Sequence, residues 1–149
     1  KKGLCTYEVE QVILAIVVTT GIASIFLTKD YTPDYNSGLA HAIFYALTSY
    51  PVIEKNHLHG EIVGFGVLLA LLVDGQDEEF EKIYLLNKSI SLPVSLDEIE
   101  ISKEQWEEST DRIPDMSDVA HYPYKVTKEM LKNAMARLEE KVRKDNHVR

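Results

Sequence analysis

The sequence predicts an all-α protein that forms a single helical domain over residues 1–149. Two long apolar runs and several amphipathic segments with helical spacing account for most of the chain. No segment has the sustained alternation of apolar and polar residues that is typical of a strand. With 149 residues, 45% of them hydrophobic and 27% charged, the chain is long and apolar enough to bury a core.

Three helices are expected in the first half of the chain. Thr6 can cap the first helix with its hydroxyl group, and an Asp-, Pro- and Asn-rich loop follows that helix. Pro51 ends the second helix, because a proline inside a helix has no N–H to donate. Asp74-Gly75 stops the third. We expect these helices over residues 6–27, 38–49 and 59–73.

Three more helices are expected in the second half, one before and two after an extended connector over residues 91–95. One covers residues 77–87, one follows a capping box formed by Ser102 and Gln105, and the last starts at Thr127. The side chains that should face the core are Phe80, Ile83, Tyr84 and Leu86 in the first of these, and Met130, Leu131, Ala134, Met135, Leu138 and Val142 in the last.

The apolar run over residues 12–28 carries no charge and, at seventeen residues, reaches the lower length limit for crossing a bilayer. It contains Thr19, Thr20, Gly21 and Ser24, and it has no aromatic belt and no positive-inside bias. We therefore expect this run and a second one, over residues 62–73, to form the centre of the helical domain. No membrane partner is predicted, and a membrane-associated protein is the alternative.

Charge and cysteine content narrow the class of protein further. A formal net charge of −8, with the basic residues concentrated near the C-terminus, argues against nucleic acid as a partner. Cys5 is the one cysteine, so an internal disulfide is excluded and a reducing compartment is favoured. Together these features predict a cytoplasmic protein.

Two histidines stand in segments suited to metal binding. His41 lies on the expected second helix and His59 opens the third, eighteen positions later, so an antiparallel helix pair can bring their imidazoles into one cleft. Glu61 could orient a metal-binding side chain without binding the metal itself. On spacing alone, two histidines this far apart are more often structural or surface residues. His57 also competes with His59, and spacing does not separate the two.

Glycines accompany the second histidine. Gly60 would let a ligand or cofactor approach the backbone closely. Gly64 and Gly66 each cost the helix about 1 kcal/mol relative to alanine, so they indicate close packing or access.

The residues around both histidines resemble a known family. Gly38-Leu39-Ala40-His41-Ala42-Ile43 and His59-Gly60-Glu61-Ile62-Val63-Gly64-Phe65-Gly66 are similar to two sequence words in the C-terminal, metal-binding half of the iron-containing alcohol dehydrogenase superfamily. Residues 91–96 and 121–127 resemble later stretches of the glycerol dehydrogenases within that superfamily. The resemblance covers most of residues 6–140.

This resemblance implies a fold and a site. The fold would be the C-terminal helical domain of dehydroquinate synthase-like and iron-containing alcohol dehydrogenases. His41 and His59 would bind a divalent metal, zinc or iron, with His57 outside the site. The third ligand would be an aspartate upstream of Lys1. The family often has histidine and asparagine where this chain has Phe44 and Tyr45.

The resemblance also implies an activity. The chain would be the C-terminal part of a two-domain, NAD-linked dehydrogenase whose substrate is a small polyol or alcohol. NAD would bind through an N-terminal domain, since these 149 residues contain no glycine-rich phosphate loop. The chain alone would be inactive, and a homo-oligomer is a further expectation.

Two other functions compete with this one. A non-catalytic helical interaction module would also lack a nucleotide-binding loop and a third metal ligand. A lyase similar to dehydroquinate synthase would share the fold and the metal site. Its phosphorylated substrate would need basic residues near the motifs, where only Lys55 is found.

Overall fold

The computed structural model describes residues 5–27 and 37–147, and within these ranges it contains helices and no strand. The expectation of an all-α protein is therefore confirmed. The chain divides into two compact units, residues 1–36 and 37–149, and each is described by itself.

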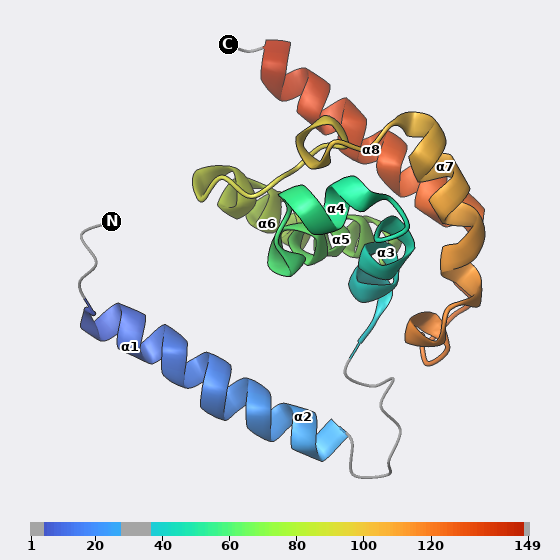
Figure 1. The fold of residues 1–149 in the computed structure, drawn as a ribbon. Helices are drawn as coiled ribbons and strands as arrows, with labels where there is room; N and C mark the ends of the chain where they lie inside the picture. Colours follow the sequence, from blue (N-terminus) through green and yellow to red (C-terminus); the bar gives the residue numbers. More distant parts are fainter. Residues whose placement is uncertain (1–4, 28–36, 148–149) are drawn as a thin grey trace. The chain divides into compact units, whose positions relative to one another are not determined.

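The first unit holds one continuous helical segment (Figure 1). It consists of α1 (Tyr7–Leu14), a π-helical stretch (Ala15–Thr20) and α2 (Gly21–Leu27). Thr6 caps it as predicted, because its hydroxyl oxygen accepts a hydrogen bond from the Val9 N–H at 3.5 Å.

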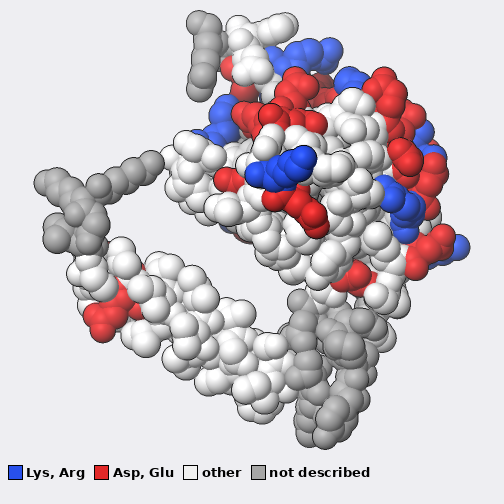
Figure 2. All heavy atoms as spheres, in the orientation of Figure 1, with Lys and Arg blue, Asp and Glu red and all other residues white. Residues whose placement is uncertain are grey.

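No side chain of Tyr7–Phe26 is buried, so the expectation that this run lies at the centre of a core is not met by the described structure. By length and composition this segment is the one described helix that could cross a membrane, with a mean hydropathy of 2.0. Figure 2 shows it as almost free of charged side chains, except for acidic residues near its start.

The second unit is built around α5 (His59–Val73), whose bounds are those predicted. This helix packs against α3 (Leu39–Leu47), α6 (Asp77–Ser89) and α8 (Lys128–His147). Its buried side chains include Ile62, Phe65, Leu68, Leu69 and Leu72. The expectation that the second apolar run forms the centre of a core is therefore confirmed.

The remaining elements of this unit surround that centre. Figure 1 shows α7 (Lys103–Arg112) beside α8, the longest helix. Three short 3-10 turns, η3 (Asp97–Ile99), η4 (Ile113–Asp115) and η5 (Ser117–Val119), connect the helices.

Most predicted helix ends are present. Gly75 adopts a left-handed φ of 69°, and the Gln76 N–H closes the end of α5 by donating to the Leu71 carbonyl at 2.9 Å. Ser102 and Gln105 form the predicted reciprocal capping box, with bonds of 3.2 and 2.8 Å.

One helix was not predicted, and one prediction was wrong. Pro51 follows the end of α3, as predicted, but it also begins α4 (Pro51–Asn56), because the first helical position needs no backbone N–H. In α6, Leu86 is 49% exposed, and the neighbouring Asn87 is buried in its place. The Asn87 amide donates to the Gly64 carbonyl at 3.4 Å, so it meets α5 through a hydrogen bond.

The backbones of α3 and α5 touch at Gly66. A Cβ at this position would lie 2.7 Å from the Ala40 carbonyl oxygen and 2.9 Å from the Ala40 Cα. Real side chains do not approach backbone so closely, so only glycine allows this crossing. At Gly64, about half a turn before the crossing, a Cβ would meet nothing nearer than the end of the Leu92 side chain at 3.5 Å.

Replacing Gly66 with alanine should therefore destabilise the protein, and the same change at Gly64 should not. We expect Gly66→Ala to lower the free energy of unfolding by about 1–3 kcal/mol through overpacking, despite the better helix propensity of alanine. Gly64→Ala should leave it unchanged or raise it by up to about 1 kcal/mol. Urea denaturation of both variants measures this, and equal midpoints would contradict the close crossing.

Candidate metal centre

The α3–α5 crossing brings His41 and His59 together. His41 is the third residue of α3 and His59 the first residue of α5. Their ring centroids lie 5.7 Å apart, and the ring planes are tilted by 43°. His41 is half-buried and His59 is exposed. The pair that the sequence words singled out is thus adjacent and open to solvent on one side.

The separation of the rings is close to that of two imidazoles sharing a divalent ion. With metal–nitrogen bonds of about 2.0–2.1 Å and a near-tetrahedral angle, two coordinating imidazoles have ring centroids about 5 Å apart. The observed 5.7 Å is slightly wider. Imidazole nitrogens are donors that suit both zinc and iron.

The electrostatic surroundings favour the neutral form of His41. Burial is the main cause that lowers its pKa below the usual 6.5, and charge on His59 lowers it further. Asp118, on η5, opposes this shift by favouring the charged form. Since a metal binds the neutral imidazole, a lowered pKa extends the metal-binding form of His41 to lower pH.

His57 occupies a different environment. Its side chain is only 10% exposed, and its Nδ1 and Nε2 atoms lie 3.5 and 3.7 Å from carboxylate oxygens of Glu61 and Glu100. The ring neighbours of His59 are instead His41 and Phe44. His57 and His59 therefore lie in different surroundings.

Glu61 does not lie beside a candidate metal ligand of the pair, although this was expected. Its carboxylate accepts a hydrogen bond from the Leu58 N–H at 3.0 Å and faces His57, so it caps α5 and does not orient His59. Gly60 has open space beside its backbone, since a Cβ at this position would meet nothing within 4 Å.

Phe44 forms a wall beside the histidine pair. It follows His41 by three residues on α3, so the two side chains share a helix face. Its ring centroid lies 4.4 Å from that of His59 in an edge-to-face arrangement. Tyr45 contacts Phe44 at 5.3 Å and is itself exposed. The sequence marked Phe44 only as a departure from the family pattern.

Asp118 was not predicted from the sequence. It acts on His41 from a segment 77 residues later in the chain, and no motif marks it. A further sign of this proximity is Gly38, where a Cβ would lie 3.9 Å from the Tyr122 ring. The segment around η5 therefore packs near the start of α3.

The described residues offer the histidine pair as candidate ligands and no third one beside it. Within residues 5–27 and 37–147, no group of three His, Cys, Asp or Glu side chains is arranged to hold a metal ion. A third ligand would have to come from outside this part of the chain.

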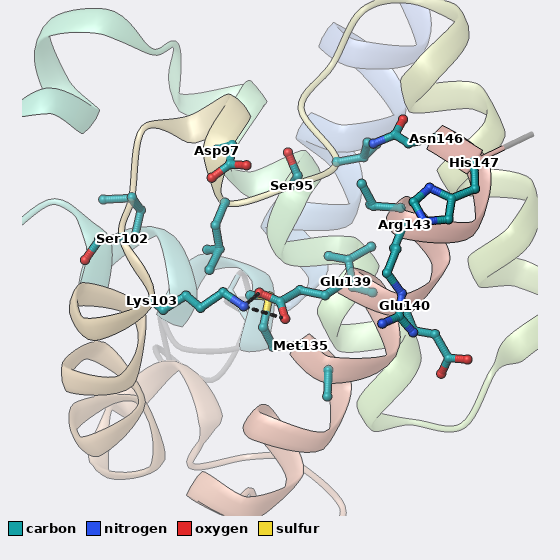
Figure 3. A pocket seen from close by; sticks show the side chains of 16 residues that line it. Ser95, Asp97, Ser102, Lys103, Met135, Glu139, Glu140, Arg143, Asn146 and His147 are labelled. Atoms are coloured by element: carbon teal, nitrogen blue, oxygen red, sulfur yellow. Dashed lines mark hydrogen bonds and ion pairs between the residues drawn. The ribbon is translucent and has the colours of Figure 1, made fainter. Parts of the chain in front are cut away.

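Two cavities lie away from the histidine pair. One of about 550 Å³ runs between the connector before α7 and the C-terminal half of α8 (Figure 3). Lys103 crosses it to pair with Glu139 at 3.1 Å. The other, of about 670 Å³, is lined by His57, Glu61 and Lys88 among others. Neither is lined by His41 or His59, which stand at an open surface.

Comparison of the chain with protein-family models and with curated proteins found no match. The family resemblance therefore rests on the sequence words alone.

The charges around His41 predict opposite effects for two substitutions. His59→Gln should raise the pKa of His41, because it removes a positive charge that disfavours protonation. Asp118→Asn should lower it, because it removes a negative charge that favours protonation. NMR titration of the His41 ring in metal-free protein measures both. A midpoint that moves in the same direction in the two variants would contradict the arrangement.

Proposed function

We propose that this chain is the metal-binding helical part of an NAD-linked, metal-dependent alcohol dehydrogenase similar to glycerol dehydrogenases. His41 and His59 would be two of its metal ligands. One observation carries the proposal: the two histidines within the family-like words are a pair whose rings lie 5.7 Å apart. His57, two residues from His59, instead lies 3.5 and 3.7 Å from carboxylate oxygens of Glu61 and Glu100.

Each residue of the site would have a distinct part. When bound, the divalent metal would act as a Lewis acid on the substrate hydroxyl group. The lowered pKa of His41 keeps its nitrogen lone pair available for coordination. The exposed His59 leaves room for a small polyol or alcohol. NAD and the third ligand would be supplied by residues outside this chain.

Two observations favour a dehydrogenase over the lyase alternative. A phosphorylated substrate is recognised by cationic side chains, and the groups described next to the histidine pair are Phe44 and the acidic Asp118. Lys55, the one basic residue near the motifs, lies on α4. The surroundings of the pair suit an uncharged alcohol better.

The metal site can be tested in the full-length protein that carries this chain. We expect His59→Ala to lose bound zinc or iron, since it removes one of the ligands. His57→Gln is the matched control, two residues away, and should retain the metal. Metal content after gel filtration measures both. A normal metal content in His59→Ala would contradict the proposed site.

The activity is tested separately, with NAD and a panel of polyols and monohydric alcohols. Oxidation should stop on chelation and return when zinc or iron is added. If the metal is bound but no alcohol is oxidised, the lyase-like or non-catalytic alternatives replace the dehydrogenase.

A further inference from the structure

Phe44 provides an apolar surface beside His59. Phe44 packs partly on the core of the second unit and presents its ring to His59 at 4.4 Å. The Phe44 side chain thus flanks the exposed imidazole with carbon and offers no hydrogen-bonding group.

Such a wall discriminates between classes of alcohol. A polyol such as glycerol carries hydroxyl groups on the carbons next to the reacting one. Against a phenyl ring these hydroxyl groups lose hydrogen bonds to water and gain none, which is unfavourable. An alkyl substituent in the same place would instead be removed from water, which is favourable.

From these contacts, and resting on the proposed function, we propose that Phe44 determines substrate specificity. The enzyme would select monohydric alcohols with an apolar carbon chain over glycerol and other polyols. Phe44 would act by contact with the substrate's carbon chain beside the metal-binding pair, and not as a ligand itself.

Tyr45 provides the matched control position. It is the next residue on α3, is also aromatic, and is 49% exposed. Its ring contact is with Phe44. An asparagine placed at either position therefore makes a similar chemical change, but only the change at 44 alters the wall next to His59.

The test uses the full-length protein with cobalt(II) in place of the native metal, so that ligand binding is read from the visible absorption spectrum without turnover. We expect wild-type protein to bind 1-butanol at least about tenfold more tightly than glycerol, in line with the discrimination that apolar pockets achieve. Phe44→Asn should reduce this ratio about tenfold. Tyr45→Asn should leave it unchanged, and Phe44→Leu, which stays apolar, should keep the preference for 1-butanol.

The outcomes separate this inference from the proposed function. Wild-type protein that binds no cobalt at His41 and His59 would overturn both. Cobalt-loaded wild-type protein that binds glycerol as tightly as 1-butanol would overturn the role of Phe44 alone. So would an unchanged ratio in Phe44→Asn. If Phe44→Asn does not fold, a Phe44→Leu variant that loses the preference would overturn it equally.

Discussion

The contact between the backbones of α3 and α5 at Ala40 and Gly66 is the constraint on which the second unit depends. Helices that cross this closely exclude any side chain at the crossing point, and a Cβ at Gly66 would lie 2.7 Å from the Ala40 carbonyl oxygen. The glycine costs α5 some helix propensity. In return, the apolar residues on both sides of the crossing, such as Ile43 and Phe65, are fully buried.

The candidate site follows from the same crossing. His41 is the residue after Ala40, so its position is fixed directly by the contact. His59 lies two helical turns before Gly66 on α5, so the helix fixes its position relative to the crossing. Phe44, one turn after His41, is then brought against His59. A divalent ion would thus meet a pair already placed by packing, which reduces the cost of assembling the site.

Local chemistry explains what could be predicted from the sequence. The bounds of α5, its end at Gly75 and the Ser102–Gln105 box depend on neighbouring residues and were predicted correctly. Features that depend on distant residues were missed. Asn87 is buried because the Gly64 carbonyl meets it, and Asp118 influences His41 across a long sequence separation. The different surroundings of His57 were also not predicted, because they include Glu100, which is distant in the sequence.

The central claim, that His41 and His59 bind the same metal ion, is tested most directly by X-ray absorption spectroscopy of the zinc-loaded full-length protein. The account predicts scattering from two imidazole rings with zinc–nitrogen distances of about 2.0–2.1 Å. It also predicts that a variant that lacks either histidine no longer retains the zinc. A zinc spectrum without imidazole scattering, or one unaffected by removal of His41, would contradict it.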